Sequence, residues 1–309
     1  MRRFLIDTDT ASDDAVALIM ALRAPNVRVE AITVVAGNLP IELAVKNALT
    51  SVEVARSYRP PVYKGVSKPL LKDLFTSEFV HGADGMGNMA LPDPASTVSD
   101  GHASDKIIEL AHRYPHELEI VTLGPLTNLA LSCVKAPELA QLVKSVFIMG
   151  GNGFGPGNVT PVAEYNIFVD AEAAQIVVNS GLPLTFVGWD VSTGDTFITQ
   201  ADIDRLLSTG SEIAQFCVRC NETLKQYNAQ TWGRAGIDLP DPVTMAVALH
   251  PEIMIQQVRA YVFVEHRSLD TYGQLVIDPY NLLERPANAT ICGQVDAARF
   301  KEILFALLQ

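Results

Sequence analysis

The stretch "RFLIDTDTASDDAVALIMAL", from Arg3 to Leu22, joins a short apolar run to an amphipathic one and places four aspartates between them. The run "RFLI" has the composition of a buried strand, and the pattern from Asp13 to Ala24 has helical periodicity. A strand that leads directly into a helix is typical of α/β proteins, in which ligands bind beyond the carboxyl ends of the strands. The stretch therefore predicts both a parallel sheet and a polar site at its edge.

The same alternation continues along the chain. The strand-like runs are "VRVEAITVVAG", "LEIVTLG", "KSVFIMGG" and "LPLTFVG", with "VRAYVFVE" and "YGQLVID" as late strands. Helical patterns lie between them, and "VDAARFKEILFALL" is a closing helix. Strands that alternate with helices favour a sheet covered on both faces. The predicted fold class is therefore α/β, with a mostly parallel central sheet flanked by helices.

Length favours one main domain over residues 1–309, because α/β folds commonly reach this size as a single unit. The part from about 199 to 249 has mainly helical patterns. Two long stretches, 68–101 and 151–166, are rich in Gly, Pro and Asn. Loops of this length in a compact domain are usually functional or mobile. We expect these two stretches to form walls of a pocket.

Charge and composition narrow the classes of partner. The net charge of −12 repels nucleic acid and anionic lipid, and no Lys/Arg cluster reverses this field locally. The start "MRRFLIDTDT" has too short an apolar run for a signal peptide, and no window approaches a membrane span. We therefore expect a cytoplasmic protein that binds a small molecule, and neither nucleic acid nor a membrane. The cysteines are expected to be reduced thiols, including the pair Cys217 and Cys220.

The four aspartates of the opening stretch repel one another unless something positive lies between them. One explanation is a helix cap, because Thr10 and Asp13 match a T-x-x-D capping arrangement. A cap leaves Asp7 and Asp9 without a role, because both precede the helix. The other explanation is a bound cation, since Asp7 and Asp9 face one side of a strand and Asp13 and Asp14 begin a helix over its end. Carboxylates without a nearby His or Cys favour Ca²⁺ or Mg²⁺.

Seven ordered segments carry a resemblance to a known family. They are "DTDTASDDAVAL" (7–18), "AGN" (36–38), "HGADGMG" (81–87), "LGPLTNLAL" (123–131), "IMGGN" (148–152), "GNVTPVAEYNIFVDAEAA" (157–174) and "DPVTMAVALHPE" (241–252). The chain resembles the inosine- and uridine-preferring nucleoside hydrolases, which split the N-glycosidic bond of ribonucleosides to a free base and ribose. The resemblance implies this activity, a Rossmann-like nucleoside hydrolase fold, and a homodimer or homotetramer.

The resemblance also implies the residues of the site. A Ca²⁺ ion is expected to be held by Asp9, Asp14, the main-chain carbonyl of Leu123 and Asp241. Asp9 is expected to activate a metal-bound water for attack on the sugar. The residues expected to contact the substrate are Asp13, Asn38, Met149, Asn158, Glu164, Tyr165 and Asn166. Asp13 and Glu164 are expected to hold ribose hydroxyls by charge-assisted hydrogen bonds, which makes the 2′-hydroxyl necessary.

The chain departs from the family where the leaving base is assisted. Many members have a His directly before the late metal-binding Asp, and here that residue is Pro240, which has no titratable group. His81 is the first replacement candidate as a catalytic acid, although a His there can equally serve only to fix its glycine-rich loop. Tyr227 and Trp232 are candidates for contact with the base, with ordinary packing as the alternative. The preferred base is not determined by the sequence.

Two other function classes compete with this interpretation. "FLIDTDT" also fits the signature of haloacid-dehalogenase-type phosphatases, in which Asp7 is a phosphoryl nucleophile, Asp9 an acid or base, and Mg²⁺ the metal. That class leaves Asp13 and Asp14 unexplained. A non-catalytic nucleoside-binding protein is the second alternative, and Pro240 is the reason to consider it. Against it, every residue needed to activate water is present, and a leaving-group acid changes the rate without being an absolute requirement.

Overall fold

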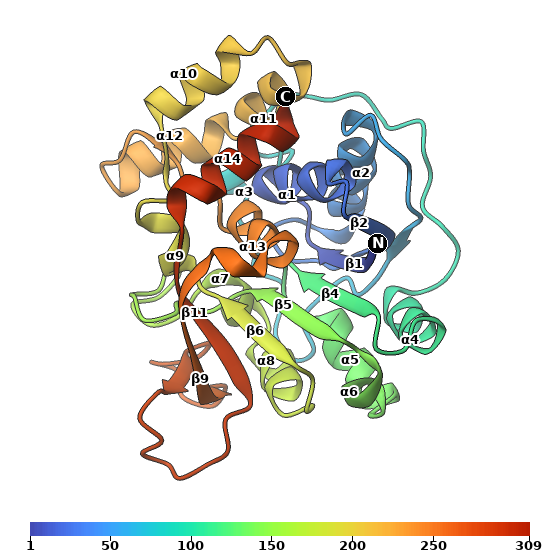
Figure 1. Ribbon diagram of the computed structural model, residues 1–309, viewed down its shortest axis with the longest axis vertical. Helices are drawn as coiled ribbons and strands as arrows, with labels where there is room; N and C mark the ends of the chain where they lie inside the picture. The colour runs from blue at the N-terminus through green and yellow to red at the C-terminus, as the bar shows by residue number, and fades with distance from the viewer.

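The computed structural model describes residues 1–309 and is built around a nine-stranded sheet. In spatial order its strands are β10 (Leu275–Asp278), β9 (Met254–Val264), β11 (Ala289–Val295), β6 (Leu184–Val187), β5 (Ser145–Met149), β4 (Leu118–Thr122), β1 (Arg2–Thr8), β2 (Val27–Val34) and β3 (Val62–Lys64). From β3 to β11 neighbouring strands pair in parallel, whereas β9 runs antiparallel to β11 and β10. The predicted mostly parallel sheet is confirmed (Figure 1).

Strand β1 occupies the position that decides where a ligand binds. It pairs with β2 on one side and β4 on the other, so the chain winds away from it in both directions. Such a point in a parallel sheet leaves a crevice beyond the carboxyl ends of the strands. β1 ends at Thr8 and β4 ends at Thr122, directly before Asp9 and Leu123. Two residues that the sequence assigned to the site therefore lie at this crevice.

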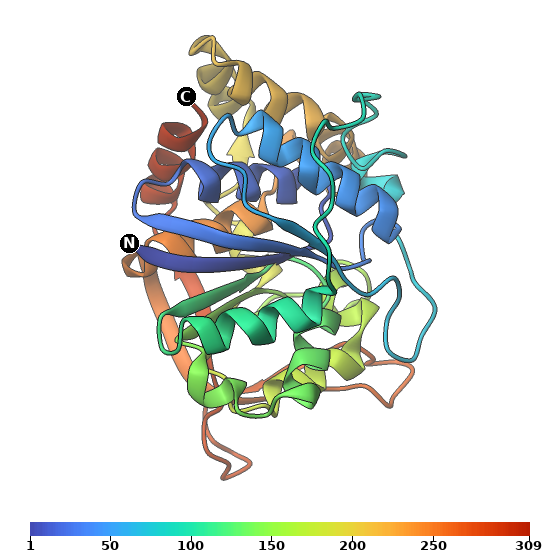
Figure 2. The same cartoon turned by 90° about the vertical axis from the view of Figure 1, so that its right-hand side faces the viewer.

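Helices cover both faces of the sheet (Figures 1 and 2). One face packs against α1 (Ser12–Arg23), α2 (Ile41–Val54) and α13 (Pro240–Leu249). Outside these helices, in the same larger apolar cluster, lie α14 (Ala297–Leu308), α11 (Glu212–Cys220) and α10 (Gln200–Ser208). The other face packs against α4 (Ala103–Arg113), α5 (Thr127–Lys135), α6 (Leu139–Leu142) and α8 (Ala171–Val178). The remaining elements are α3 (Glu78–His81), α7 (Tyr165–Val169), α9 (Trp189–Thr193), α12 (Glu222–Thr231), the 3₁₀ turn Pro251–Ile253 and the short strands β7 (Ile198–Thr199) and β8 (Gly236–Ile237).

Some elements were not predicted from the sequence. Strand β3 is only three residues long, and α4 follows directly on one of the irregular stretches. Strand β11 contains Gly293 and has register shifts against β9, so its own sequence is a poor strand signal. It becomes a strand because it lies between β6 and β9, which pair with it from both sides.

Residues 199–249 hold α10, α11, α12 and α13, with β8 between the last two. The division into domains stays a prediction. None of the helices combines the length and the apolar composition that a membrane-spanning segment requires. The cysteines are buried free thiols, and burial raises the pKa of Cys217 and Cys220 in α11.

Candidate active site

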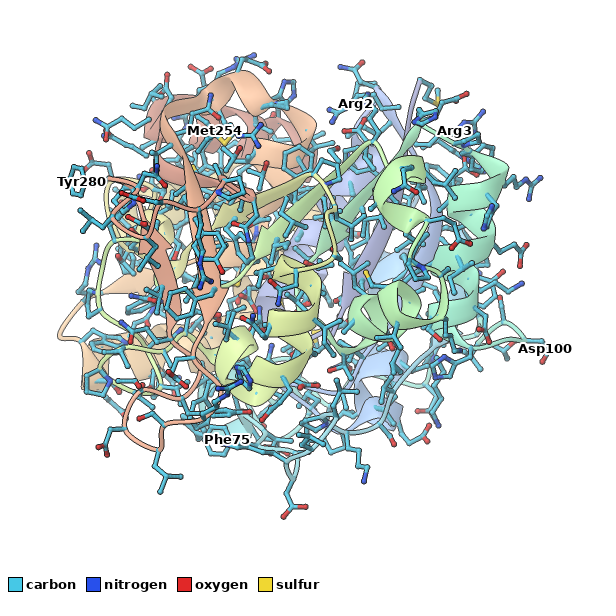
Figure 3. The ribbon with its side chains drawn as sticks, turned by 90° about the horizontal axis from the view of Figure 1, so that it is seen from below. Arg2, Arg3, Phe75, Asp100, Met254 and Tyr280 are labelled. Carbon is cyan, nitrogen blue, oxygen red and sulfur yellow. The ribbon has the colours of Figure 1, made fainter.

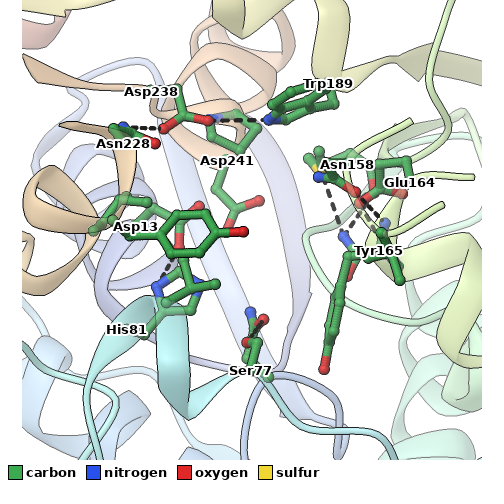
Figure 4. A pocket seen from close by; sticks show the side chains of 18 of the residues that line it. Asp13, Ser77, His81, Asn158, Glu164, Tyr165, Trp189, Asn228, Asp238 and Asp241 are labelled. Carbon is green, nitrogen blue, oxygen red and sulfur yellow. Dashed lines mark hydrogen bonds and ion pairs between the residues drawn. The ribbon is translucent and has the colours of Figure 1, made fainter. Parts of the chain in front are cut away.

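A pocket lies at the carboxyl end of the parallel strands and encloses about 720 Å³ of empty space, part of it open to solvent. Both irregular stretches supply wall residues, as expected. The lining residues discussed below are Asp13, Asn38, Ser77, Phe79, His81, Leu123, Met149, Asn158, Glu164, Tyr165, Asn166, Trp189, Tyr227, Asn228, Trp232, Asp238, Pro240 and Asp241 (Figure 4). Figure 3 shows Phe75, which precedes Ser77, at the opposite end of the molecule from Arg2 and Arg3 of β1.

Asp13, Asp14 and Asp241 form a buried acidic cluster at this pocket. One carboxylate oxygen from each residue lies within 4.8 Å of the others. Asp13 and Asp14 stand in the first turn of α1, and Asp241 stands in the first turn of α13, which packs against α1. The first turn of a helix carries partial positive charge. The two helix starts therefore offset part of the repulsion that the cluster creates.

The cluster has the properties of a metal site. Burial raises the pKa of Asp13 and of Asp14 to about 7, and raises that of Asp241 well above its ordinary range. Oδ1 of Asp13 and Oδ1 of Asp9 are buried without a hydrogen-bond partner. An unpartnered buried carboxylate is costly, and a hard cation accepts several such oxygens at once. The donor set therefore fits a hard metal ion.

The cap of α1 differs from the one predicted. The helix begins at Ser12, and Oδ2 of Asp14 accepts the backbone N–H of Ala11 at 2.9 Å. Oδ1 of Asp14 accepts the hydroxyl of Thr8 at 2.5 Å. The predicted pairing of Thr10 with Asp13 is wrong because the helix begins at Ser12, one residue later than a cap at Thr10 requires, which makes Asp14 the third helical residue. Asp13 takes no part in the cap, and it lines the pocket.

The carboxylate of Asp9 is enclosed by the backbone that follows the two strands beside β1, which are β2 and β4. Its Oδ2 accepts the N–H of Asn38 at 2.6 Å. A Cβ atom at Gly37 would lie 2.1 Å from Oδ2, and one at Gly124 would lie 2.6 Å from Oδ1, so both positions must lack a side chain. Asp9 does not line the pocket, and Asp13 stands in the acidic cluster where the resemblance implied Asp9. Asp9 as a metal ligand therefore stays a prediction.

Replacement of Gly37 by alanine is expected to lower turnover roughly 10²-fold, because a misplacement of a reacting group by about 1 Å has an effect of this size. The new methyl group must displace the Asp9 carboxylate. Gly194→Ala is the matched control, since a Cβ there meets no atom within 4 Å. The measurement is kcat/KM of both variants at matched helix content. Equal activity in the two variants would contradict the placement of Asp9.

Asp7 does not join the other aspartates, and the expectation that all four converge is wrong for it. Its Oδ1 accepts hydrogen bonds from Thr33 of β2 at 2.6 Å and from Asn128 of α5 at 2.8 Å. It is fully buried and does not line the pocket. Asp7 therefore ties the central strand to its neighbours.

One wall of the pocket is polar and rigid. Glu164 caps α7, because its Oε1 accepts the N–H of Asn166 at 2.9 Å and its Oε2 accepts the N–H of Gly151 at the same distance. Burial raises the pKa of Glu164 to about 7. Asn158 accepts the N–H of Tyr165 at 2.9 Å. The predicted substrate-binding residues of this segment thus lie together on one side of the pocket (Figure 4).

Two amides connect this wall with the strand ends. The Asn166 side chain donates to the carbonyl of Leu123 at 2.7 Å and to Sδ of Met149 at 3.1 Å. That carbonyl, which the resemblance assigned to the metal, retains a second lone pair. Asn38 accepts the hydroxyl of Ser77 at 2.6 Å through its own side-chain oxygen. The orientation of each amide is therefore fixed by partners on other strands and loops.

His81 points its Nδ1 at the start of α1. It lies 2.8 Å from the hydroxyl of Ser12 and 3.7 Å from Oδ1 of Asp13. Burial lowers the pKa of His81 to about 4, so the imidazole is neutral at neutral pH. A general acid is most effective when its pKa is near the working pH. The geometry favours a positioning role for His81, and its catalytic role stays a prediction.

A second part of the lining, the aromatic wall, consists of rings. Tyr227 of α12 meets Phe79 of α3 edge to face with ring centres 5.9 Å apart, and Trp232 meets Trp189 at 5.6 Å. Trp232 is 43% exposed, so it is not a core residue. The pocket thus combines carboxylates and amides with aromatic rings. A sugar joined to a flat heterocycle presents hydroxyls to the first kind of group and a flat face to the second.

Comparison with known families agrees with this geometry. Residues 4–302 match the family described as inosine-uridine preferring nucleoside hydrolase. The chain belongs to this family. It is therefore a nucleoside hydrolase, an N-glycosidase, and the haloacid-dehalogenase alternative is excluded by the full-length match.

Similar nucleoside hydrolases act on different bases. The chain is 38% identical over 306 residues to pyrimidine-specific ribonucleoside hydrolase RihA of Salmonella agona, covering 99% of this chain and 97% of the relative. A plant nucleoside hydrolase, PpNRh1, has a TM-score of 0.93 at 31% identity, and a purine-preferring ribonucleoside hydrolase from Gardnerella vaginalis has one of 0.92 at 29% identity. Each structural match covers 99% of this chain and 98% of the other.

Sequence reasoning missed several residues of this nucleoside hydrolase's pocket. Ser77 was missed because serine is common in loops. Trp189 stands two residues after the end of β6, so its position after a strand could have indicated it. Asp238 stands two residues before Pro240 and was passed over beside Asp241. Pro240 itself is the first residue of α13, where a proline favours helix initiation and thereby positions Asp241.

Proposed function

We propose that this nucleoside hydrolase cleaves ribonucleosides in a Ca²⁺-dependent reaction, with Asp9 as the base that activates water. The observation that carries the proposal is the acidic cluster, buried beside a pocket with one polar and one aromatic wall. The carboxylates fit an ion, the polar wall fits ribose, and the rings fit a base. Family membership indicates that the bond broken is the N-glycosidic bond.

The ion would be held by Asp9, Asp14, Asp241 and the carbonyl of Leu123. These donors are all oxygen atoms, which is the ligand set of Ca²⁺. A bound ion supplies a lowered pKa for a coordinated water and a charge that offsets the acidic cluster. Asp13 is available as a further oxygen donor from the same cluster.

Asp9 carries the proton transfer in this proposal. Its Oδ1 has no hydrogen-bond partner, while its Oδ2 is fixed by Asn38, so one oxygen is free to accept a proton. As the N-glycosidic bond breaks, its electron pair leaves with the base and positive charge develops on the sugar, as in other glycosyl hydrolysis, until the activated water adds to the anomeric carbon. The buried carboxylates of Asp13 and Glu164 favour that charge electrostatically. Binding and charge stabilisation then come from the same groups.

The ribose is proposed to lie against Asp13, Asn38, Asn158, Glu164 and Asn166, with Met149 and Tyr165 beside it. Hydrogen bonds already hold the side chains of Asn38, Asn158, Glu164 and Asn166 in place, so they need little further ordering when the sugar binds. Such a wall uses contacts to the non-reacting hydroxyls to orient the bond that breaks.

Removal of the 2′-hydroxyl is expected to lower kcat/KM roughly 10²-fold or more. A site built to bond a hydroxyl leaves its own buried polar groups unpaired when that hydroxyl is missing. The measurement compares uridine with 2′-deoxyuridine, and inosine with 2′-deoxyinosine. Similar values within each pair would remove Asp13 and its neighbours from the ribose site.

The test of the function is release of reducing sugar from a panel of purine and pyrimidine ribonucleosides. Sugar release by the calcium-loaded protein supports the proposal. A non-catalytic binding protein would bind a nucleoside in calorimetry without releasing sugar.

Assembly is the last part of the proposal. We expect a homodimer or homotetramer, as in many members of the family. Light scattering coupled to size exclusion measures the mass directly, and a single species of about 33.5 kDa, the mass of one chain, would contradict it.

A further inference from the structure

Asp238 lies at the aromatic wall in a fixed orientation. Its Oδ2 accepts the indole N–H of Trp189 at 3.0 Å, and its Oδ1 accepts the side-chain N–H of Asn228 at 2.6 Å (Figure 4). Asp238 itself is 8% exposed and lines the pocket. Its two hydrogen-bond partners are a neutral indole and a neutral amide, and no cationic side chain forms an ion pair with it. A buried carboxylate without a cation, held at a pocket wall, is unusual and needs an explanation.

The partners of Asp238 are themselves anchored. Asn228 also donates to the carbonyl of Gly236 at 3.3 Å, and its own carbonyl accepts the N–H of Trp232. The backbone N–H of Trp189 donates to Gly151 at 2.9 Å. The Asp238 carboxylate therefore cannot turn away from the pocket without breaking bonds at both oxygens.

Asp238 retains capacity to accept. A carboxylate offers about four lone-pair positions, and the two protein donors occupy two of them. The remaining positions can accept hydrogen bonds from a further donor. Pro240, two residues further on, presents no hydrogen-bonding group of its own side chain to the same wall. Asp238 is thus a fixed acceptor, and the anionic one, at the part of the wall formed by Trp189 and Trp232.

We propose that Asp238 accepts a hydrogen bond from an N–H at the edge of the nucleobase and thereby determines which bases bind. The inference rests on the proposed function, because it requires the ribose to lie against the polar wall and the base against the aromatic one. The group that meets the base here is an acceptor. Bases that present a lone pair or a methyl group at this edge are excluded by repulsion or by loss of the bond.

A purely structural role predicts a different pattern. If Asp238 served only to hold Trp189 and Asn228, its loss would weaken all nucleosides alike. If Asp238 contacts the base, loss of Asp238 instead changes the ratio of kcat/KM for a nucleoside to kcat/KM for its N-methyl analogue. The pairs are uridine with 3-methyluridine and inosine with 1-methylinosine. In each analogue a methyl group replaces the hydrogen on the ring nitrogen.

The experiment measures kcat/KM for the faster of the two nucleosides and for its N-methyl analogue. The wild-type protein is expected to cleave the analogue roughly 10- to 10²-fold less well. Asp238→Asn keeps the volume but replaces one acceptor oxygen by an N–H donor. This variant is expected to reduce the ratio of kcat/KM for the nucleoside to kcat/KM for its N-methyl analogue at least about tenfold. Trp189→Phe is the matched control, because it removes the indole N–H and keeps the carboxylate, so the ratio should persist.

The outcomes are distinct. An equal rate for nucleoside and analogue in the wild type overturns the inference without any variant, and so does an unchanged ratio in folded Asp238→Asn. If Trp189→Phe also cleaved the nucleoside and its N-methyl analogue equally well, Asp238 would have a positioning role only. No sugar release from any nucleoside by the wild type would instead overturn the proposed function on which the inference rests.

Discussion

Replacement of Asp9 by asparagine is expected to lower sugar release roughly 10²- to 10⁴-fold, which is the usual effect of removing a general base. Asparagine has nearly the same volume, so it fits between Gly37 and Gly124, and it still accepts the N–H of Asn38. It cannot accept a proton. The measurement is single-turnover sugar release with excess protein, together with the calcium content of the variant.

Asp7→Asn is the matched control, because Asp7 stands two residues earlier and is equally buried. Its partners are Thr33 and Asn128, so the change is expected to lower the melting temperature and leave most of the turnover. A variant Asp9→Asn that retains calcium and full turnover would exclude Asp9 as the base. If that variant lost calcium, the loss of rate would report on the ion instead.

Removal of the metal is expected to abolish turnover, and added Ca²⁺ to restore it. Without an ion, the carboxylates of Asp9, Asp14 and Asp241 repel one another in a buried site, and nothing lowers the pKa of the attacking water. The ion also binds only the folded chain, so saturating calcium is expected to raise the melting temperature by roughly 5 °C. The measurements are turnover and thermal unfolding after chelation and after addition of Ca²⁺ or Mg²⁺.

Asp241→Ala separates this effect from other effects of chelation. The variant lacks a carboxylate that is expected to bind the ion, so calcium should restore neither its turnover nor its melting temperature. Full turnover of the wild type in excess chelator, at verified absence of metal, would contradict a metal-dependent reaction.

The metal-free protein should also respond to pH in a defined direction. Burial raises the pKa of Asp13 and Asp14 to about 7, whereas an aspartate in an unfolded chain titrates near pH 3.9. Between these values the folded protein keeps protons that the unfolded chain has lost, so the free energy of unfolding falls as pH rises from about 4 to 7. His81, with its pKa lowered to about 4, acts in the opposite direction, and several carboxylates outweigh it. The melting temperature after chelation should be higher at pH 5 than at pH 8.

Periodicity was sufficient to predict the parallel sheet, because the strands beside β1 are apolar runs with clear helical patterns between them. Strand β11 could not be predicted in this way, since its pairing with β6 and β9 is a long-range property. The same distinction applies to the site. Asp13, Asp14 and Asp241 belong to segments with a recognisable motif, whereas Trp189 and Asp238 become neighbours only through tertiary packing.

Two local details also depended on three-dimensional geometry. The cap of α1 lies one residue from its predicted position, because the hydroxyl of Thr8 selects Asp14 as its partner. Asp7 was expected to face the site with Asp9, since alternate strand residues share a side. The hydrogen bonds from Thr33 and Asn128 instead hold it within the sheet.

The acidic cluster has a consequence for the order in which the chain acquires its structure during synthesis. Asp13 and Asp14 leave the ribosome with the first helix, whereas Asp241 follows only with the last helix but one. Until then the first βα unit carries its charges without the partner helix α13 and therefore without the complete acidic cluster. The opening segment of the chain is therefore expected to dock late, after most of the protein has emerged.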